Sequence, residues 1–363
     1  MTTFRWGILG TGFVAKKFAL GLGALPDTEV TAVASRSLDN AKGFAAGLGP
    51  SVRAITYEDL VQQPDVDGVY IATPPALHSE HALLAINAGK AVLIEKPFCA
   101  DAAEARALAA AAKEKNVFCM EAMWTRFTPV VRRAKAMIDN GDLGAIRLLT
   151  GNFCLTEMES EENHLFRSDL GGGALLDRGV YLLSLAIYYL GVPSSVTGSS
   201  VIGTSGVDVQ SSMSLVWNRP DDRYPCVGHF HASLVSDAVN DFHIAGDKAK
   251  LHIPGPVYRP SLLKYSAVSQ SEKLATRALS KKDRVKENHW THQVVQRAMP
   301  LLSAFGMRGS KKIRLPYGGN AYQYQAQEVA ECVAAGKIES DIMPLDHSVA
   351  VLEIIGQLRA GRS

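Results

Sequence analysis

The sequence has few of the residues that mark metal-rich, disulfide-bonded or membrane proteins. Its 363 residues include five cysteines, an odd number, and no two are spaced as Cys-x-x-Cys. Neither a metal site nor a disulfide framework is therefore expected, and a reducing compartment fits best. The longest apolar run, 180–192, is shorter than the ~20 residues that span a bilayer. The first predicted strand begins almost at residue 1, which leaves no room for a cleavable signal, so we predict a cytoplasmic protein.

A strong overall charge is also absent, because 38 Lys and Arg residues are nearly balanced by 36 Asp and Glu residues. The balance hides one asymmetry: residues 257–314 contain 13 basic and 3 acidic residues. Such a block can mark a nucleic-acid or anionic-membrane partner. It lacks the regular aromatic residues of a base-stacking surface. We therefore favour a solvated basic insertion at 260–314, and contact with nucleic acid or membrane is not expected.

A glycine turn near the start is the first positive signal. The apolar run FRWGIL at 4–9 is followed by GTGFVA at 10–15 and then by residues with helical spacing. A strand, a G-x-G-x-x-A turn and a helix are typical of dinucleotide binding. A side chain at the first glycine would block the tight turn, and one at the second would keep a pyrophosphate away from the helix amides. The predicted cofactor contacts in this turn are Gly10, Thr11, Gly12, Phe13 and Val14.

The second predicted strand, 29–34, lacks the acidic residue that usually follows it in NAD-binding chains. Ser35 and Arg36 stand there instead. An acidic residue would bind the ribose hydroxyls of NAD, whereas an arginine accommodates the 2′-phosphate of NADP. Ser35 can add a hydrogen bond, and Arg36 can also stack on the adenine. We predict NADP rather than NAD, with an ordinary loop arginine as the alternative.

Apolar runs and helical segments keep alternating up to residue 122. Strands are expected at 51–55, 66–74, 91–98 and 117–122, and helices at 57–62, 77–88 and 101–115. Strands and helices in alternation predict a doubly wound parallel sheet. Thr73 and Pro74 end one of these strands beside the expected cofactor crevice. His78 follows them, and it either contacts the cofactor or packs at the start of the next helix.

The stretch AVLIEKPF at 91–98 carries the strongest local signal. A short apolar run that ends in charged residues and proline is typical of a buried parallel strand, and such sheets bind ligands at the carboxyl ends of their strands. A lysine at that position needs a partner or a function, and Glu95 can provide a partner. We predict that Glu95 and Lys96 lie at the cofactor. The alternative is an exposed Glu-Lys pair in a turn.

The pattern changes after residue 123. Strand-like runs separated by Gly, Asn and Asp follow one another, with one helix at 179–190. They predict an α+β domain built on a large, mostly antiparallel open sheet. Such a sheet needs a cover, and a second subunit is the usual one, so we expect a homodimer. The predicted parts are 1–122, 123–320, and 321–363, whose helices should pack back on both domains.

The second informative stretch is LGGGALLDRGVY at 170–181. Asp177 and Tyr181 are four residues apart as a helix begins, which places them on one face. A phenol has a pKa near 10, so a tyrosine that carries protons at neutral pH needs a cation nearby. Lys96 is the candidate cation, and Asp177 would orient it or the hydroxyl. Taken alone, Tyr181 is more typical of a core aromatic than of a proton carrier. The combination favours proton transfer by Lys96 and Tyr181 and hydride transfer by a nicotinamide.

Four segments together resemble the Gfo/Idh/MocA oxidoreductase family, closest to its branch of dimeric dihydrodiol dehydrogenases and NADP-linked xylose dehydrogenases. They are GILGTGFVAKKF, IATPPALHSEHALLAINAGKAVLIEKPF, MEAMWTRF and GGGALLDRGVY. The resemblance implies a Rossmann domain, a sheet used for dimerisation, and hydride transfer between NADP(H) and a sugar or cyclic diol. It implies catalytic roles for Lys96, Asp177 and Tyr181. The substrate-pocket aromatics of the branch correspond to Trp124, Phe153 and Tyr258.

Two stretches depart from the pattern of that branch. Residues 266–314 are longer and more basic than it requires, and Arg167-Ser168-Asp169 replaces an acidic-proline turn. Both departures leave the identity of the substrate open. A Rossmann fold does not by itself imply catalysis. The alternative function is a non-catalytic sensor or regulator that binds a dinucleotide.

Overall fold

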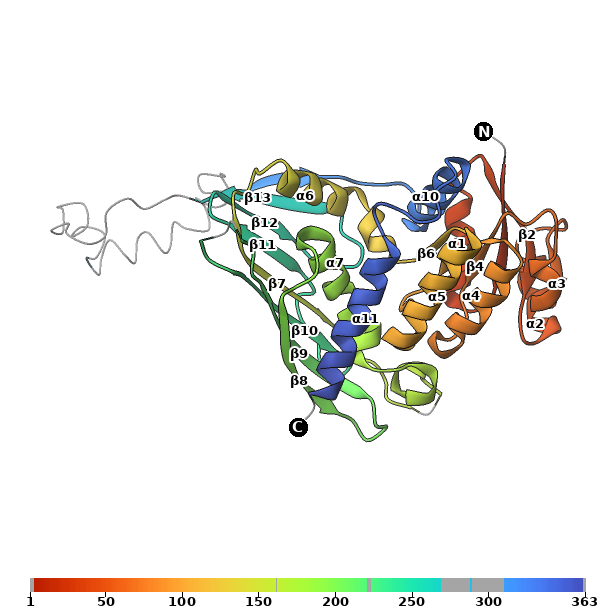
Figure 1. The fold of residues 1–363 in the computed structure, drawn as a ribbon, viewed down its shortest axis with the longest axis horizontal. Helices are drawn as coiled ribbons and strands as arrows, with labels where there is room; N and C mark the ends of the chain where they lie inside the picture. Colours follow the sequence, from red (N-terminus) through yellow and green to blue (C-terminus); the bar gives the residue numbers. More distant parts are fainter. Residues whose placement is uncertain (1–2, 161, 221–222, 269–287, 289–309, 362–363) are drawn as a thin grey trace.

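Two β-sheets divide the chain (Figure 1). The computed structural model describes residues 3–160, 162–220, 223–268, 288 and 310–361. The first sheet has the order β3-β2-β1-β4-β5-β6, and its pairings are all parallel. The second has the order β14-β13-β12-β11-β7-β10-β9-β8, and its pairings are antiparallel except that of β7 with β10. The predicted fold class is confirmed.

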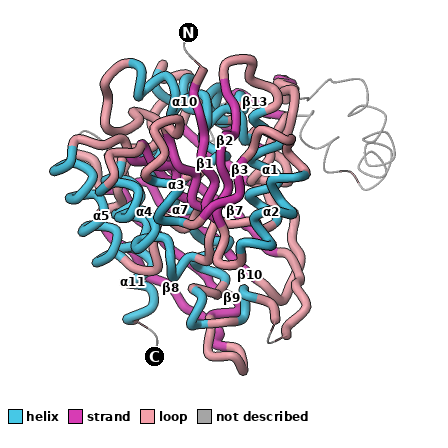
Figure 2. Tube along the Cα trace, turned by 90° about the vertical axis from the view of Figure 1, so that its right-hand side faces the viewer, coloured by secondary structure: helices cyan, strands magenta, loops and turns pink. Residues whose placement is uncertain are grey.

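The nucleotide-binding half alternates strands and helices as expected. Its strands are β1 (Phe4–Leu9), β2 (Thr28–Ala34), β3 (Arg53–Ile55), β4 (Gly68–Ile71), β5 (Ala91–Ile94) and β6 (Cys119–Glu121). Its helices are α1 (Phe13–Leu22), α2 (Leu38–Ala46), α3 (Tyr57–Val61), η1 (Pro75–Leu77), α4 (His78–Asn87) and α5 (Ala102–Lys115). Figure 2 shows α1 and α2 on one side of the sheet and α4 and α5 on the other. β4 and β5 are buried along their whole length, which explains their unbroken apolar sequence.

The second half contains the larger sheet. Its strands are β7 (Ile146–Cys154), β8 (Ser195–Ile202), β9 (Asp208–Trp217), β10 (Cys226–Ser233), β11 (Phe242–Gly246), β12 (Ala249–Ile253), β13 (Leu262–Ala267) and β14 (Lys311–Arg314). The helical elements are η2 (Trp124–Phe127), α6 (Pro129–Asp139), η3 (His164–Phe166), η4 (Ser168–Leu170), η5 (Leu175–Gly179), α7 (Val180–Leu190), α10 (Tyr322–Ala334) and α11 (Leu345–Ala360).

One face of the second sheet packs on helices, and the other is open. Side chains of β9, β10 and β12 alternate between buried and more exposed positions, as expected for a sheet with one solvated face. Helix α7, buried along its whole length, packs against β7. Helix α11 contacts α5 in the first half and α7 and β8 in the second, while α10 packs on α1 (Figure 1). The C-terminal helices thus join the two halves.

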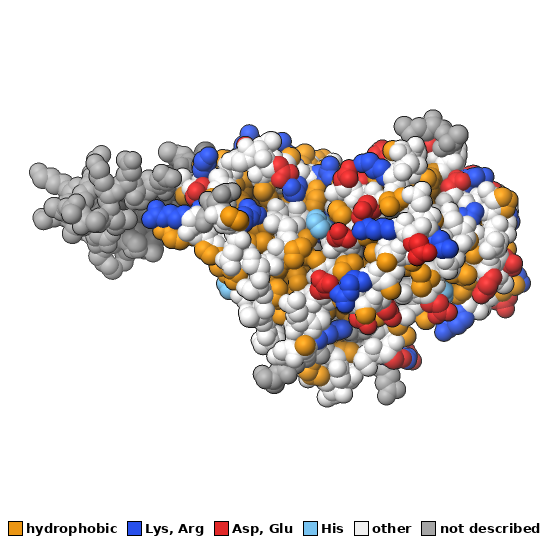
Figure 3. Space-filling view, in the orientation of Figure 1, with side chains coloured by type: hydrophobic (Ala, Val, Ile, Leu, Met, Phe, Trp, Pro, Cys, Tyr) orange, Lys and Arg blue, Asp and Glu red, His pale blue; other side chains and the backbone are white. Residues whose placement is uncertain are grey.

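The basic segment differs from the prediction. Residues 262–267 and 311–314 are not inserted: they form β13 and β14, the edge strands of the second sheet. The inserted part is therefore narrower than 260–314, and most of it lies outside the described residues. On the face of the molecule drawn in Figure 3, acidic and basic side chains are mixed over the nucleotide-binding half.

Two local predictions also need correction. The strand expected at 91–98 ends at Ile94, because Pro97 cannot donate a backbone hydrogen bond and 95–98 form a loop. Helix α7 is preceded by the π-helical turn η5, which contains Asp177. The expected spacing of four residues on a regular α-helix therefore does not describe Asp177 and Tyr181. Single π-helical turns occur frequently at functional sites.

The stretch Ser168–Leu190, which includes α7, is long and apolar enough to cross a membrane by length and composition. In the structure, 83% of its most apolar window is buried inside the protein. Its apolar side chains therefore contribute to the core between the two halves.

Candidate functional site

The loop after β5 meets the turn before α7. Lys96 Nζ lies 2.5 Å from Asp177 Oδ1 and 3.2 Å from the carbonyl oxygen of the same residue. It also lies 5.2 Å from the centre of the Tyr181 ring. Lys96 is thus brought together with Asp177 and Tyr181, which follow it by 81 and 85 positions in the chain. The Lys96 and Asp177 side chains are 16% and 17% exposed, so the ion pair is largely shielded from water.

For both members of this ion pair, the neighbouring polar and charged groups together shift the pKa more than burial does. Burial disfavours the ammonium, but the Asp177 carboxylate and Tyr181 favour it, and the net effect raises the pKa of Lys96. Burial likewise opposes the Asp177 carboxylate, but Lys96 and Arg178 lower the pKa of Asp177. Both groups are charged at neutral pH. Lys96 is a fixed positive charge beside the Tyr181 ring, and Asp177 holds it there.

Tyr181 differs from the expectation in one respect. Burial raises the pKa of Tyr181 above its ordinary value, although Lys96 acts in the opposite direction. The expected stabilisation of tyrosinate is therefore outweighed, and the phenol keeps its proton at neutral pH. Trp124 Nε1 donates a hydrogen bond to the Tyr181 oxygen at 3.2 Å. The phenol accepts that bond, which leaves its own proton free for another acceptor.

The Glu95 carboxylate is bound to β4 of the first sheet and to the Lys96 backbone. It accepts a very short hydrogen bond from the Tyr70 hydroxyl and a second, at 3.2 Å, from the backbone N–H of Lys96. Burial raises the pKa of Glu95 to about 7, against the effect of the Tyr70 hydrogen bond. The ion-pair partner of Lys96 is thus Asp177 rather than Glu95, which the sequence suggested, and Glu95 holds the Lys96 backbone instead.

His78 is fully buried at the start of α4. Its Nδ1 lies 2.8 Å from the carbonyl oxygen of Pro97, and its Nε2 lies 2.8 Å from that of Thr73. Both ring nitrogens therefore contact backbone, which favours the packing alternative over a cofactor contact. The ring ties the end of β4 to the loop that carries Lys96. Thr73 also lies 3.0 Å from His81 through its hydroxyl, and Pro74 is exposed beside it.

The glycine turn has the geometry of an anion site. Gly10 has φ +104°, and a Cβ there would lie 2.4 Å from the carbonyl oxygen of Ala72, so the fold itself requires this glycine. Gly12 has ordinary extended angles, and a Cβ there would have no neighbour within 4 Å. Nothing within the described residues requires a glycine at position 12. The open space over Gly12 fits a group bound from outside.

Helix α1 begins at this space without a cap. Helices α2, α3 and α5 are capped by Ser37, Thr56 and Asp101, whereas α1 has no side-chain cap and no acidic residue in its first turn. Its first amides are available to an anion, as in dinucleotide-binding folds. The residues present therefore fit a bound dinucleotide, whose pyrophosphate Gly12 and the α1 amides would hold.

We expect substitutions at the two glycines to separate fold from binding. Gly12→Ser should keep or raise the thermal midpoint because serine is a good helix cap, while lowering the affinity for the dinucleotide at least ~10-fold, about 1.4 kcal/mol. Gly10→Ala should lower the free energy of unfolding by ~2 kcal/mol or more, because alanine is strained at this φ and clashes with backbone. Thermal unfolding and fluorescence titration with NADPH measure both effects. Equal NADPH affinity of Gly12→Ser and wild type would contradict a pyrophosphate at this turn.

The remaining predicted cofactor residues border the same turn. Thr11 Oγ1 lies 3.4 Å from Ser35 Oγ, which joins the turn to the end of β2. Arg36 is exposed, and its backbone hydrogen-bonds the Tyr57 hydroxyl. Phe13 is 71% exposed, with Lys17 Nζ 4.5 Å from its ring centre, and Val14 is partly buried. Most of the Phe13 ring is therefore apolar surface open to solvent at the start of α1.

Aromatic rings form a cluster around Tyr181. Phe153 packs edge-on against Tyr181 at 5.3 Å between ring centres, and it stacks on Tyr258 at 5.0 Å. Trp124 lies 6.2 Å from Tyr258, so the three aromatics that the resemblance implied do meet. The cluster is mainly apolar with few polar groups, a composition that is typical of small-molecule sites.

Sequence reasoning missed two members of this cluster. Tyr322, at the start of α10, stacks on Trp124 with 5.0 Å between ring centres. Tyr322 is far from Trp124 along the chain and stands in no recognisable motif, so the sequence did not indicate their contact. Arg178 lies over the Phe153 ring at 4.8 Å, 3.1 Å from the Asp177 carboxylate, and pairs with Glu157. Its place beside Asp177 was the signal available in the sequence.

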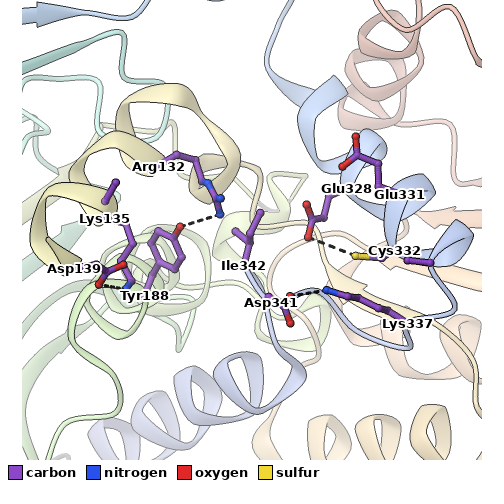
Figure 4. Close-up of a pocket in the computed structure, with 12 residues that line it drawn as sticks. Arg132, Lys135, Asp139, Tyr188, Glu328, Glu331, Cys332, Lys337, Asp341 and Ile342 are labelled. Atoms are coloured by element: carbon purple, nitrogen blue, oxygen red, sulfur yellow. Dashed lines mark hydrogen bonds and ion pairs between the residues drawn. The ribbon is translucent and has the colours of Figure 1, made fainter.

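A separate cleft of about 530 Å³ lies between α6 and α10 (Figure 4). One wall carries Arg132 and Lys135, and the opposite wall carries Glu328 and Glu331. Arg132 donates to the Tyr188 hydroxyl at 3.2 Å. None of the predicted catalytic residues lines this cleft, so the predicted chemistry belongs elsewhere.

Comparison with known proteins agrees with these features. The Gfo/Idh/MocA model described as an oxidoreductase family with an NAD-binding Rossmann fold matches residues 4–123, and the Gfo/Idh/MocA C-terminal domain matches 131–252. Trans-1,2-dihydrobenzene-1,2-diol dehydrogenase of Bos taurus is 30% identical over 98% of this chain and 96% of its own length. D-xylose 1-dehydrogenase (NADP(+)) of Hypocrea jecorina is 28% identical over 99% and 92%.

A solved structure shares the fold over the full length. The 3-ketoreductase of Actinomadura kijaniata, in complex with NADP and TDP-benzene, has a TM-score of 0.76 and 24% identity, and the match covers 99% of this chain and 98% of that one. Family models, full-length relatives and the two-sheet architecture therefore agree with the four segments of the sequence. The chain belongs to the Gfo/Idh/MocA family of oxidoreductases.

Proposed function

We propose that this protein transfers a hydride between NADP(H) and a secondary alcohol or carbonyl of a sugar or cyclic diol. The observation that carries the proposal is the meeting of Lys96, from the nucleotide-binding half, with Asp177 and Tyr181, from the sheet-rich half. The relatives support it, because one is a diol dehydrogenase and another an NADP-linked xylose dehydrogenase.

Tyr181 is the proposed proton carrier. The bound nicotinamide would supply or accept the hydride at the substrate carbon. In the direction of reduction, the phenol donates its proton to the carbonyl oxygen, which suits a tyrosine that burial keeps protonated. The Lys96 ammonium then stabilises the phenolate that forms, and Asp177 acts as a positioning residue for Lys96. In the direction of oxidation the same groups work in reverse, which requires the proton to return to Tyr181 from the alcohol.

Aromatic rings near Tyr181 support a ring-shaped substrate. Phe153 packs on Tyr181 and Tyr258, and Trp124 donates a hydrogen bond to the Tyr181 hydroxyl; Phe153 and Trp124 are buried, and Tyr258 is partly exposed. The apolar C–H face of a sugar or cyclic diol packs well on such surfaces, and its hydroxyls need only a few polar groups for orientation. Arg178 and Lys96 are charged groups beside these rings.

NADP is the proposed cofactor because Arg36 stands exposed at the carboxyl end of β2, where a 2′-phosphate would lie. We expect Arg36→Gln to raise the KM for NADP⁺ by about 10- to 100-fold, since a charged hydrogen bond is worth ~1.5–3 kcal/mol. The KM for NAD⁺ should change little, because NAD⁺ lacks that phosphate. Steady-state kinetics with both cofactors measure this, with Lys115→Gln, an exposed charge on α5, as the control. Parallel changes for the two cofactors would contradict the role of Arg36.

We also propose a homodimer formed through the open face of the second sheet. Side chains of β9 and β10 that point to this face are less buried than their neighbours, and Leu148 on β7 is 40% exposed. On β8, Val201, which pairs with the exposed Gln210 of β9, is 57% exposed. Exposed apolar side chains on a broad sheet favour a protein cover.

The direct test is a screen of NADP⁺ reduction over aldoses, inositols and cyclic diols, with NAD⁺ in parallel. We expect turnover with at least one of these polyols and a higher kcat/KM with NADP⁺. A protein that binds NADPH but oxidises or reduces none of these substrates, nor the corresponding ketones, would be the non-catalytic sensor instead. Comparable kcat/KM values with both cofactors would support the proposed dehydrogenase activity but contradict the proposed preference for NADP.

A further inference from the structure

Two histidines stand side by side on the second sheet. His243 of β11 lies directly opposite His252 of β12 in the antiparallel register. Their imidazole rings stack with 4.0 Å between centres and 7° between planes. Directly opposed residues of antiparallel strands are close enough for their side chains to share a ligand. The two strands are neighbours in Figure 1.

A carboxylate completes the group. Asp241 Oδ2 lies 3.0 Å from His243 Nε2 and 2.9 Å from His252 Nε2. The three ligand atoms all lie within 4.8 Å of one another. In the single chain, the side chains of Asp241, His243 and His252 are 12%, 44% and 27% exposed, on the same open face of the second sheet through which the homodimer is proposed.

Asp241 is held in place by groups that leave Oδ2 to the histidines. Asn152 Nδ2 donates to the other carboxylate oxygen, Oδ1, at 3.2 Å. The backbone N–H of Asn152 also donates to the Asp241 carbonyl oxygen at 3.1 Å. Asn240, with φ +58°, makes the turn before Asp241, and its N–H donates to Asn152 Oδ1 at 2.6 Å. Outer contacts of this kind orient the ligands of metal sites.

We propose that Asp241, His243 and His252 bind a divalent transition-metal ion of the Zn²⁺ class. The ligand atoms would be Asp241 Oδ2 and the two Nε2 atoms. Two imidazoles and one carboxylate suit zinc, cobalt or nickel, whereas Mg²⁺ and Ca²⁺ require oxygen ligands. Three protein ligands leave a fourth position for water or a further ligand. The site lies on β11 and β12, apart from Lys96, Asp177 and Tyr181, and does not depend on the proposed redox chemistry.

The neighbouring side chains set the strength of this site. Lys264 on β13 stands opposite His252, and Thr150 on β7 stands opposite His243. A nearby ammonium repels a divalent cation, so Lys264 weakens the site without taking part in it. Replacing Lys264 by glutamine should therefore tighten metal binding. A merely structural hydrogen-bond cluster gives no reason for such a gain.

The test is a titration of the full-length protein, freed of metal by a chelator, with Zn²⁺ in a calorimeter and with Co²⁺ in a spectrophotometer. We expect one ion per chain, and visible Co²⁺ absorption of a low-coordinate site with nitrogen ligands. His243→Ala, at the most exposed ligand, should weaken binding at least ~100-fold, and Asp241→Asn at least ~10-fold. Lys264→Gln should strengthen it. The control is His229→Ala, an exposed histidine of β10 on the same sheet.

Several results would overturn the site. Absence of stoichiometric Zn²⁺ binding by the wild type would do so, as would equal losses in His229→Ala and His243→Ala. Circular dichroism of each variant shows whether it folds. His243→Gln keeps the side chain polar at a partly exposed position, so it tests the ligand role if the alanine variant does not fold. Zn²⁺ affinity of a folded His243→Gln equal to that of wild type would also refute the proposal.

Discussion

Replacing Tyr181 by phenylalanine is expected to lower kcat by about 10²- to 10⁴-fold, the usual contribution of a positioned proton carrier. The ring and its packing against Phe153 remain in this variant, and only the hydroxyl that Trp124 contacts is lost. The Kd for NADPH should stay within a few fold of the wild-type value, because the glycine turn is untouched. Steady-state kinetics with the best substrate of the screen, together with NADPH titration, measure both quantities.

Helix α7 itself offers a matched control. The Tyr189 hydroxyl is buried and has no hydrogen-bond partner among the described residues. Tyr189→Phe therefore removes an unsatisfied polar group and should leave kcat unchanged and stability equal or higher. If Tyr181→Phe and Tyr189→Phe both retain wild-type kcat, Tyr181 is a core aromatic and the proposed proton transfer is wrong.

Replacing Lys96 by methionine should also lower kcat by orders of magnitude, for an electrostatic reason. The substitution removes the cation 5.2 Å from the Tyr181 ring centre, and with it the charge that stabilises phenolate. The pKa of Tyr181 should then rise further, so the ascending limb of the pH–rate profile for oxidation, along which the phenol loses its proton, should move to higher pH. Measurement of kcat from neutral pH to well above pH 10 tests this shift. A lower kcat with an unchanged pH profile would assign Lys96 to substrate positioning alone.

A double substitution separates stability from catalysis at the same pair. Lys96→Met leaves the Asp177 carboxylate largely buried with Arg178 still beside it. The stability cost should be below the ~3–5 kcal/mol typical of a fully uncompensated buried charge. Adding Asp177→Asn should recover most of that stability without restoring kcat, because the neutral amide needs no cation. Recovery of kcat in the double variant would mean that Lys96 serves only to neutralise Asp177.

Much of the first half could be predicted because its signals are local. The glycine turn, the alternating apolar runs and the polar helix caps at Ser37, Thr56 and Asp101 all act over a few residues. Such short-range effects leave a pattern in a single sequence. The loop 95–98 was mistaken for strand because burial continues past Ile94 even though strand pairing stops there.

The site was predictable only in part, because contacts between residues that are distant in the chain leave no local pattern in the sequence. Lys96, Asp177 and Tyr181 stand in recognisable local stretches, so they could be named before their contact was known. Tyr322 stands in no such stretch, and its stacking on Trp124 results from α10 returning to the first half. The pair His243 and His252 depends on the register of β11 and β12, which no spacing of cysteines or histidines revealed.

The chain's own residue order determined the alternating nucleotide-binding half, the uncapped glycine turn, the sheet-rich second half and the residue types available for proton transfer. Only the tertiary structure decided which charged side chains form ion pairs. It paired Lys96 with Asp177 rather than Glu95, and it buried Tyr181 deeply enough to raise its pKa despite the adjacent ammonium. Solvation and Coulomb energies depend on distances in space, and residues 81 positions apart acquire a distance only when the two halves pack together.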